Sequence, residues 1–527
     1  MSFFIVSIID PDLEDILGQI VGEDFSLSRD RAQLLITKEV MRHLKRFHDD
    51  TKIVIERNYV DKVYRDSYYT YYASKRTSYG RDAIKLSFFS DVADQIRIDT
   101  FKKTDKVTFL EESYRGFIVL RPTPPYIVGR SAIAPNLLKS NSFKTCLAYM
   151  PSTAVGLKVC AQAFPFSSQD TETISCAETM IWALMEYYGN KYAEYSPVLP
   201  SQILNILKQN IVERQLPSSG LSVDSMSYLL KECGFGPKLY SRKEFASDFN
   251  MLLSCYVESG IPVIIALDNA EAVKNKKIER LIGHAVLCIG HEDITEDTVR
   301  TITSEDFPLK NSKGVLKIKD WDTISKKFIF IDDNFPVYQA DSLDMPTKRY
   351  LDIPESEYTD AEAKKKADKE WAACKISHFI VPLYKKIYLE AYVAKKFVKE
   401  LLSSEYFEYA DNREIHIRTF LCSARSYRKY VMLSDMPDKL KSLIMEKSFP
   451  KFVWITEVTS HWTAFGRTNG VVILDATEAN TLDYRPLIFA ICNGFIVQYD
   501  KNTKSIASCQ ITGCDFSVFD KNLKKLS

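Results

Sequence analysis

The chain has 527 residues, enough for about three domains of ordinary size. Its 46% apolar and 26% charged residues are typical of a globular protein, and its net charge of +1 excludes a bulk electrostatic attraction to nucleic acid or to an anionic membrane. No run of the sequence approaches the ~20 apolar residues of a membrane helix, so we predict a cytoplasmic protein with no membrane contact.

The 11 cysteines are odd in number, scattered, and mostly set in apolar sequence. This distribution favours reduced thiols in a cytosol-like compartment over a framework of disulfides. No group of cysteines and histidines has the spacing of a metal site. The sequence therefore predicts neither a metal ion nor another cofactor.

Residues 1–150 are predicted to form a mixed α/β domain of unknown role. The apolar start lacks a basic leader and is cut short by Asp10, which favours a first strand over a signal peptide. Apolar spacing then predicts a helix over 29–47 and strands at 51–57 and 117–120. The last strand runs into Arg121-Pro122-Thr123-Pro124-Pro125, which must leave the sheet because proline has no N–H.

Two features of this domain allow more than one interpretation. Tyrosines and basic residues alternate from 64 to 81, a pattern that can clamp single-stranded nucleic acid. An aromatic packing layer is the favoured interpretation, and nucleic acid is not an expected partner. Arg121 and Arg130 flank the proline-rich turn and can bind an anion, although a bond to a carboxylate is favoured.

Residues 151–390 are predicted to form the domain that carries the chemistry. Periodicity predicts helices at 177–188, 222–233 and 245–256, then strands at 261–267, 285–289, 328–331 and 378–383. A charged, alanine-rich stretch near 354–374 is expected to form a solvated helical insertion rather than a lid. Residues 391–527 are predicted as a third, mixed α/β domain, with strands at 452–458 and 471–476.

Cys176 begins the first helix of the central domain, and Gly189 is expected to end that helix. A thiol reacts as the thiolate, which a helix N-terminus and a neighbouring imidazolium both stabilise. This position favours a nucleophile over a structural cysteine. Gln169, a few residues upstream, is a candidate to help the backbone hold a developing oxyanion, and Gln162 is the weaker candidate.

His284 opens the strand at 285–289, directly after Gly283, where its imidazole would face a cleft at the edge of the sheet. Together with a cysteine at a helix start, it is predicted to act as a general base. Asp332 ends the next strand, and its carboxylate can accept the Nδ1–H of the imidazole. Asp333 and Asn334 are adjacent alternatives that the alternation of side chains along a strand does not separate.

The span from about 164 to 338 resembles the papain-like cysteine peptidase superfamily, and it is most similar to the bacteriocin-leader (double-glycine) peptidases and their relatives. The blocks Ser259-Gly260-Ile261-Pro262-Val263 and Gly283-His284-Ala285-Val286 carry the most specific part of the resemblance. It implies an α+β fold, in which an N-terminal helical part and an antiparallel sheet are flanked by the two mixed α/β domains. It also implies Cys176 as nucleophile, His284 as base, Asp332 as its orienting carboxylate and Gln169 as oxyanion donor.

The leading hypothesis is a cysteine protease that hydrolyses a peptide or isopeptide bond through an acyl-enzyme, with a protein or peptide as its substrate. A thiol acyltransferase of the transglutaminase type would use the same residues, with an amine in place of water. A catalytically inactive papain-like scaffold that binds proteins is the non-enzymatic alternative. The flanking domains are expected to choose the substrate or a regulatory protein partner.

Overall fold

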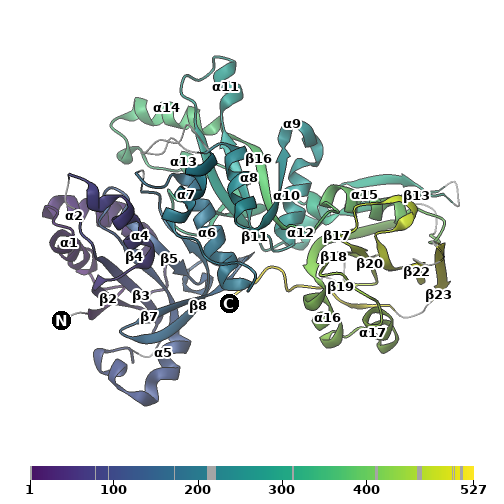
Figure 1. The fold of residues 1–527 in the computed structure, drawn as a ribbon, viewed down its shortest axis with the longest axis horizontal. Coiled ribbons are helices and arrows are strands. Elements are labelled where there is room, and N and C mark those ends of the chain that lie inside the picture. The colour runs from purple at the N-terminus through teal and green to yellow at the C-terminus, as the bar shows by residue number, and fades with distance from the viewer. Residues whose placement is uncertain are drawn as a thin grey trace.

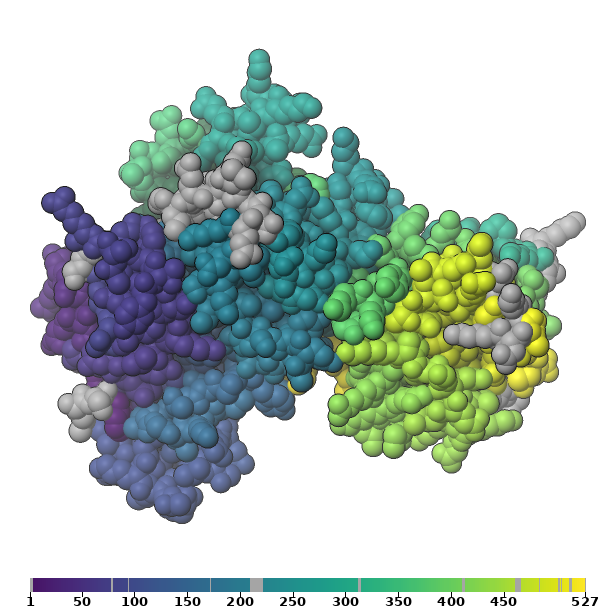
Figure 2. All heavy atoms as spheres, viewed as in Figure 1, coloured from purple at the N-terminus to yellow at the C-terminus, as the bar shows by residue number. Residues whose placement is uncertain are grey.

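The computed structural model describes residues 3–526 except 77–78, 93, 171, 211–220, 311–313, 410–412, 460–465, 501–502, 504 and 511–513. Helices and mainly antiparallel sheets make up an α+β protein, as predicted. Three large sheets succeed one another across the molecule (Figure 1). In the space-filling view most of the residues that follow about 410 lie in a lobe beside the central part (Figure 2). None of the described helices combines the length and apolar character that a membrane crossing requires.

The first sheet has seven antiparallel strands, and it contains the strands predicted at the start of the chain, at 51–57 and at 117–120. Its order is β1 (Phe3–Ser7), β2 (Thr51–Tyr59), β3 (Ala83–Ser90), β4 (Tyr114–Leu120), β5 (Val128–Ile133), β8 (Leu157–Phe166) and β7 (Ala148–Ala154). Its helices are α1 (Leu13–Asp24), α2 (Arg29–Leu35), α3 (Met41–Leu44), α4 (Lys62–Thr70) and α5 (Val107–Ser113). The helix predicted over 29–47 is α2, a π-helical turn at Ile36–Val40, and α3.

The second, central sheet is also antiparallel and contains the four strands predicted for the central domain. Its order is β15 (Gln339–Ser342), β14 (Lys327–Ile331), β11 (Gly283–Glu292), β10 (Val263–Asp268), β16 (Lys375–Tyr384) and β9 (Phe235–Ser241), with the short β6 (Phe143–Thr145) beside β11. Helices α7 (Pro200–Asn210) and α8 (Val223–Glu232) follow α6 (Cys176–Lys191), and Ser222 caps α8.

The two faces of the central sheet enter different hydrophobic cores because side chains alternate along each strand. In β11, Leu287 and Ile289 belong to the core that contains α6 and the first sheet. Val286 and Cys288 belong to the core that contains α10 (Phe249–Glu258) and part of the third sheet. The helix that begins with Cys176 therefore lies on the face shared with the first sheet.

The third sheet has eight strands, and only β13 and β17 pair in parallel. Its order is β12 (Ser304–Pro308), β13 (Val315–Asp320), β17 (Glu414–Ser423), β18 (Phe452–Thr459), β20 (Gly470–Asp475), β21 (Leu487–Cys492), β22 (Phe495–Asp500) and β23 (Ser505–Gln510). One face packs against α10 and α15 (Ala391–Leu402), and the other against α16 (Ala424–Leu433) and α17 (Asp438–Met445).

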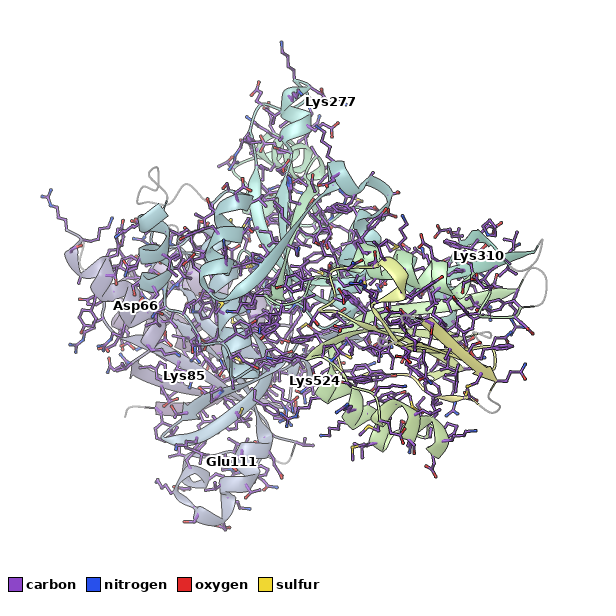
Figure 3. The ribbon with its side chains drawn as sticks, turned by 45° about the vertical axis from the view of Figure 1, so that its right-hand side comes forward. Asp66, Lys85, Glu111, Lys277, Lys310 and Lys524 are labelled. Carbon is purple, nitrogen blue, oxygen red and sulfur yellow. The ribbon has the colours of Figure 1, made fainter. Side chains whose placement is uncertain are left out.

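The domain boundaries at 150 and 390 stay predictions. The sheets do not follow these boundaries, because strands on either side of each boundary belong to the same sheet. Strand β8 follows residue 150 yet pairs within the first sheet, and β12 and β13 precede residue 390 yet belong to the third. The C-terminal segment also returns to the middle of the molecule, where Lys524, labelled in Figure 3, exchanges backbone hydrogen bonds of 2.9 Å with Thr145. Three sheets are thus joined by segments that are distant in the chain.

Gly189 does not end the helix that contains it, since α6 continues to Lys191. The local rule that glycine ends helices fails here because the position has a tertiary role. A Cβ atom at Gly189 would lie 2.4 Å from Cδ and 2.5 Å from N of Pro197. The glycine lets the returning chain pack directly against the helix.

The contact between β6 and β11 yields a test of the fold. A Cβ atom at Gly290 would lie 2.1 Å from the carbonyl oxygen of Lys144, which is backbone and cannot rotate away. We expect Gly290→Ala to lower the free energy of unfolding by about 3 kcal/mol, the upper range for overpacking a core. Denaturant unfolding monitored by circular dichroism measures this change.

Gly283→Ala is the matched control because it lies in the same strand and a Cβ there meets nothing within 4 Å. Its expected effect is within about 0.5 kcal/mol. Equal effects of the two substitutions would contradict the close approach of β6.

Candidate active site

Cys176 is the first residue of α6, as predicted. The start of the helix is fixed by a capping box, in which the backbone N–H of Ser175 donates to Glu178 over 3.0 Å. Every residue of α6 from Ala177 to Tyr188 is buried, whereas Cys176 is partly exposed. The thiol therefore lies at the accessible end of a helix that is otherwise embedded in the core.

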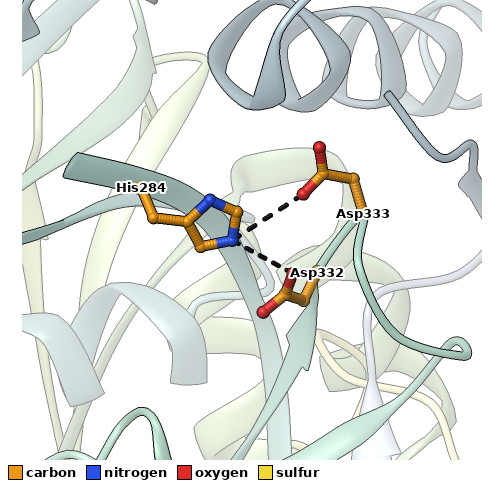
Figure 4. A group of neighbouring side chains, drawn as sticks. All are labelled: His284, Asp332 and Asp333. Atoms are coloured by element: carbon orange, nitrogen blue, oxygen red, sulfur yellow. Dashed lines mark hydrogen bonds and ion pairs between the residues drawn. The ribbon is translucent and has the colours of Figure 1, made fainter. Parts of the chain in front are cut away.

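His284 and Asp332 meet at one end of the central sheet. Strands β11 and β14 are antiparallel neighbours in which Leu287 lies opposite Ile331, so the residue after Ile331 reaches the beginning of β11. The Nε2–H of His284 donates to Oδ1 of Asp332 over 3.0 Å (Figure 4). The expectation that the carboxylate would accept from Nδ1 is wrong. It is Nε2 of the ring that points toward the end of β14, where Asp332 lies.

Cys176 is the other group that acts on His284. Burial alone would lower the pKa of the imidazole, but Asp332 and Cys176, through their charges and hydrogen bonds, raise the pKa well above its ordinary value. Since Nε2 faces the carboxylate, Nδ1 is the ring nitrogen left for the thiol. The structure thus brings the three residues together in the order cysteine, histidine and aspartate.

Asp332 is completely buried, and an arginine and a tyrosine from α13 (Lys348–Leu351) surround it. Arg349 donates to Oδ2 from Nε over 2.8 Å and from a terminal nitrogen over 2.6 Å, and the Tyr350 hydroxyl lies 3.0 Å from the same oxygen. Burial would raise the pKa of Asp332, but the charges of Arg349 and His284 hold it well below its usual range. The carboxylate is therefore ionised and accepts the imidazole N–H.

Sequence reasoning did not identify Arg349 or Tyr350. Both follow Asp332 by 17 and 18 residues and lie on a single helical turn with no motif around them. The pairing of a buried carboxylate with a cation is the physical signal, and it becomes visible only when burial is known.

Asp333 and Asn334 take other positions. The Oδ1 atom of Asp333 lies 3.7 Å from Nε2 of His284, beyond hydrogen-bonding distance, and its two oxygens have no hydrogen-bond partner among the residues that the structure describes (Figure 4). Burial, followed by the neighbouring charge of Asp332, raises the pKa of Asp333 to about 7, although the charge of His284 acts in the opposite direction. The side chain of Asn334 bonds a different group, since its Nδ2 donates to the Tyr350 hydroxyl over 3.1 Å.

Gln169 lies beside this group, whereas Gln162 does not. The Nε2 atom of Gln169 donates to Oδ1 of Asn334 over 3.2 Å, which links the loop before Cys176 to the loop after β14. Gln162 lies in β8, where it donates to the Tyr149 hydroxyl over 3.2 Å and accepts from Lys524. The geometry favours Gln169 of the two candidates.

An aromatic layer covers the imidazole. Trp371, from α14 (Ala361–Ala372), stacks on Tyr350 with ring centroids 3.6 Å apart, and its centroid is 6.1 Å from that of His284. The insertion near 354–374 does contain a largely exposed helix, as predicted. The prediction of a solvated helix did not include one contact with the site, which is the packing of Trp371 on Tyr350 and near His284.

His284, Asp332 and Asp333 are also a set whose possible ligand atoms all lie within 4.8 Å of one another. A divalent cation can use such a set. However, the oxygens of Asp332 already accept hydrogen bonds from Arg349, Tyr350, His284 and the Asn334 N–H. A metal ion would have to replace these bonds, so the geometry suits a hydrogen-bonded histidine better.

No protein-family model matches the chain, and the search of curated proteins finds no match either. The sequence pattern and the geometry of the site are therefore the observations that bear on function.

The unequal protonation of the two aspartates predicts a change in stability with pH. The folded protein keeps Asp333 protonated up to about pH 7, whereas the unfolded chain loses this proton near pH 4. The folded state then binds the extra proton, and stability falls as pH rises through this window. Because asparagine does not titrate, we expect the free energy of unfolding of Asp333→Asn, relative to that of the wild type, to rise by about 2 kcal/mol between pH 5 and pH 8. Denaturant unfolding at both pH values measures this difference.

Asp332→Asn is the control with the opposite sign, because the low pKa of Asp332 means that its ionised form stabilises the fold. This variant should be less stable than the wild type at both pH values. Parallel stability profiles for Asp333→Asn and the wild type would contradict the raised pKa of Asp333.

Proposed function

We propose that the chain is a cysteine peptidase that hydrolyses a peptide or isopeptide bond through an acyl-enzyme. The observation that carries the proposal is the position of His284, which interacts with the Cys176 thiol on one side and with the ionised Asp332 on the other. The resemblance to papain-like peptidases supports the same three residues in the same order.

Acylation begins with a thiolate at Cys176 and an imidazolium at His284. The thiolate sulfur attacks the carbonyl carbon of the substrate, and the carbonyl oxygen becomes an oxyanion. His284 then gives its Nδ1 proton to the leaving amine as the C–N bond breaks, which leaves a thioester on Cys176. Asp332 keeps the ring oriented by holding the Nε2–H during this transfer.

Deacylation uses the same groups in reverse. The neutral His284 takes a proton from water, and the hydroxide oxygen attacks the thioester carbon. The free acid is released and the thiolate–imidazolium pair is restored. In both steps Gln169 stabilises the oxyanion: its Nε2 carries two hydrogens, and one is used by Asn334 while the other is left for the substrate oxygen.

Selective alkylation tests the proposed nucleophile. We expect iodoacetamide at pH 6 to label Cys176 at least ten times faster than the exposed Cys160 and Cys509, because a thiol at a helix N-terminus beside an imidazole is activated as a nucleophile. His284→Ala should remove this advantage. Peptide mapping by mass spectrometry gives the rate at each cysteine.

Product analysis then identifies the reaction. A peptide library incubated with the wild type should yield new carboxylates, and Cys176→Ala should yield none. Amine adducts in place of carboxylates would show acyl transfer instead of hydrolysis. Labelling of Cys176 no faster than that of Cys160 and Cys509 would overturn the proposal.

A further inference from the structure

The two loops that carry the polar groups of the site are held by the domain built on the first sheet. We define the oxyanion loop as residues 167–170, which precede Cys176, and the acid loop as residues 332–338, which follow β14. Each loop offers backbone carbonyl oxygens to arginine side chains from the first domain. These arginines lie far from either loop in the sequence.

Arg121 holds the oxyanion loop. It follows β4 directly, is 4% exposed, and donates from one terminal nitrogen to the carbonyl oxygens of Ser168 over 2.8 Å and Gln169 over 3.0 Å. The expected bond to a carboxylate is found for the other arginine at this turn, Arg130, which pairs with Glu186 over 3.0 Å. Arg121 thus fixes the backbone of the residue that is proposed to bind the oxyanion.

Arg42 and Arg46 hold the acid loop from α3 and the turn that follows it. Arg42 donates to the carbonyl oxygen of Asn334 over 3.3 Å and lies 5.2 Å above the ring of Phe335. Arg46 donates to the carbonyl oxygen of Tyr338 over 3.0 Å. These bonds set the position of Asn334, which accepts the hydrogen bond from Gln169.

The Gln169–Asn334 hydrogen bond therefore has an arginine of the first domain at each end. Arg121 holds the backbone of the donor residue, and Arg42 holds the backbone of the acceptor residue. The same domain contacts the chain before Cys176 once more, since Lys75 pairs with Glu172 over 3.0 Å. The tyrosine-rich segment thus contributes to a packing surface for the site.

We propose that Arg121 is a positioning residue that holds Gln169 in the geometry needed for oxyanion binding, with Arg42 holding the Asn334 end of the same bond. The inference rests on the proposed function, because it assigns a role to Gln169 within that reaction. It makes the first domain part of the machinery of the site. A shift of about 1 Å in a donor is enough to lose much of its contribution.

Two small probes separate this role from general stability. Iodoacetamide alkylates the thiolate without forming an oxyanion, whereas p-nitrophenyl acetate acylates it through a tetrahedral oxyanion and releases p-nitrophenolate. We expect Arg121→Ala to slow acylation of Cys176 by p-nitrophenyl acetate about tenfold, and to change the rate with iodoacetamide by less than about twofold. Hydrolysis by Cys176→Ala gives the background to subtract.

Arg115→Ala is the matched control. Arg115 lies in β4 and also donates to backbone carbonyl oxygens, those of Glu112 over 2.6 Å and Tyr114 over 3.2 Å, but outside both loops. Its removal should leave both rates unchanged. Arg121→Lys and Arg42→Ala serve as milder variants if Arg121→Ala does not fold, and each should lower the acylation rate by a smaller factor.

A double-mutant cycle shows whether Arg121 acts through Gln169. Gln169→Ala is expected to slow acylation by on the order of 10²-fold. In the Gln169→Ala background, Arg121→Ala should lower the acylation rate by less than about twofold, because the side chain that Arg121 positions has been removed. A merely structural role would give the same factor in both backgrounds and would overturn the inference.

The failure of the inference and the failure of the proposed function are distinguishable. A wild-type protein that reacts with p-nitrophenyl acetate no faster than Cys176→Ala overturns both. An active wild type with an equally active Arg121→Ala, or with parallel losses toward the two probes, overturns the positioning role alone.

Discussion

A carboxylate without access to solvent is the constraint around which the site is organised. Asp332 has no exposed surface, and an unpaired charge in such a place would cost several kcal/mol. Arg349 offsets this cost with two hydrogen bonds to one oxygen, and the other oxygen accepts from His284 and from the Asn334 N–H. Arg349 also bonds Asp341 over 2.6 Å. The same hydrogen bonds to Asp332 and Asp341 therefore fix the fold of residues 332–350 and the orientation of the imidazole.

The same interaction explains why two adjacent aspartates differ. Asp332 and Asp333 are equally buried, but the direct bonds of Arg349 go to Asp332. The pKa of Asp332 is held below its usual range, while that of Asp333 is raised to about 7. Neighbouring carboxyls whose environments separate their pKa values take different roles. This contrast supports Asp332, among the three candidates at this strand end, as the residue that orients the histidine.

Local patterns predicted much of the fold and most of the candidate site. Cys176 begins a helix and His284 lies at the start of a strand, and apolar periodicity marks where each element starts. Arg349 and Trp371 were not predicted, since their role arises from packing between segments that no local pattern connects. Gly189 was wrongly predicted to end a helix for the same reason, because its tertiary contact with Pro197 requires a glycine within the helix. Strands β12 and β13 joined the third sheet through a parallel pairing that the sequence does not signal.

The two flanking domains meet the central sheet on opposite faces, and this arrangement separates their contributions. The first domain shares a core with α6 and reaches the loops of the site with its arginines. The third sheet packs against α10, where Arg418 bonds both Glu258 and Glu457 at 2.6 and 2.8 Å. Such a buried ionic network fixes the orientation of the third sheet but makes no contact with Cys176, His284 or Asp332 among the described residues.

A cavity between the central and third sheets has a volume of about 760 Å³, and its lining includes Tyr188 and Lys191, in the last turn of α6. Cys176 begins this helix, so these two lining residues lie about 18 to 22 Å along the helix axis from the residue that carries the thiol, at ~1.5 Å per residue. A peptide that reached both places would need about six extended residues. On the proposed function, a substrate group bound in this cavity would be an anchor distant from the thiol, whereas the first domain would set the geometry of the proposed reacting groups.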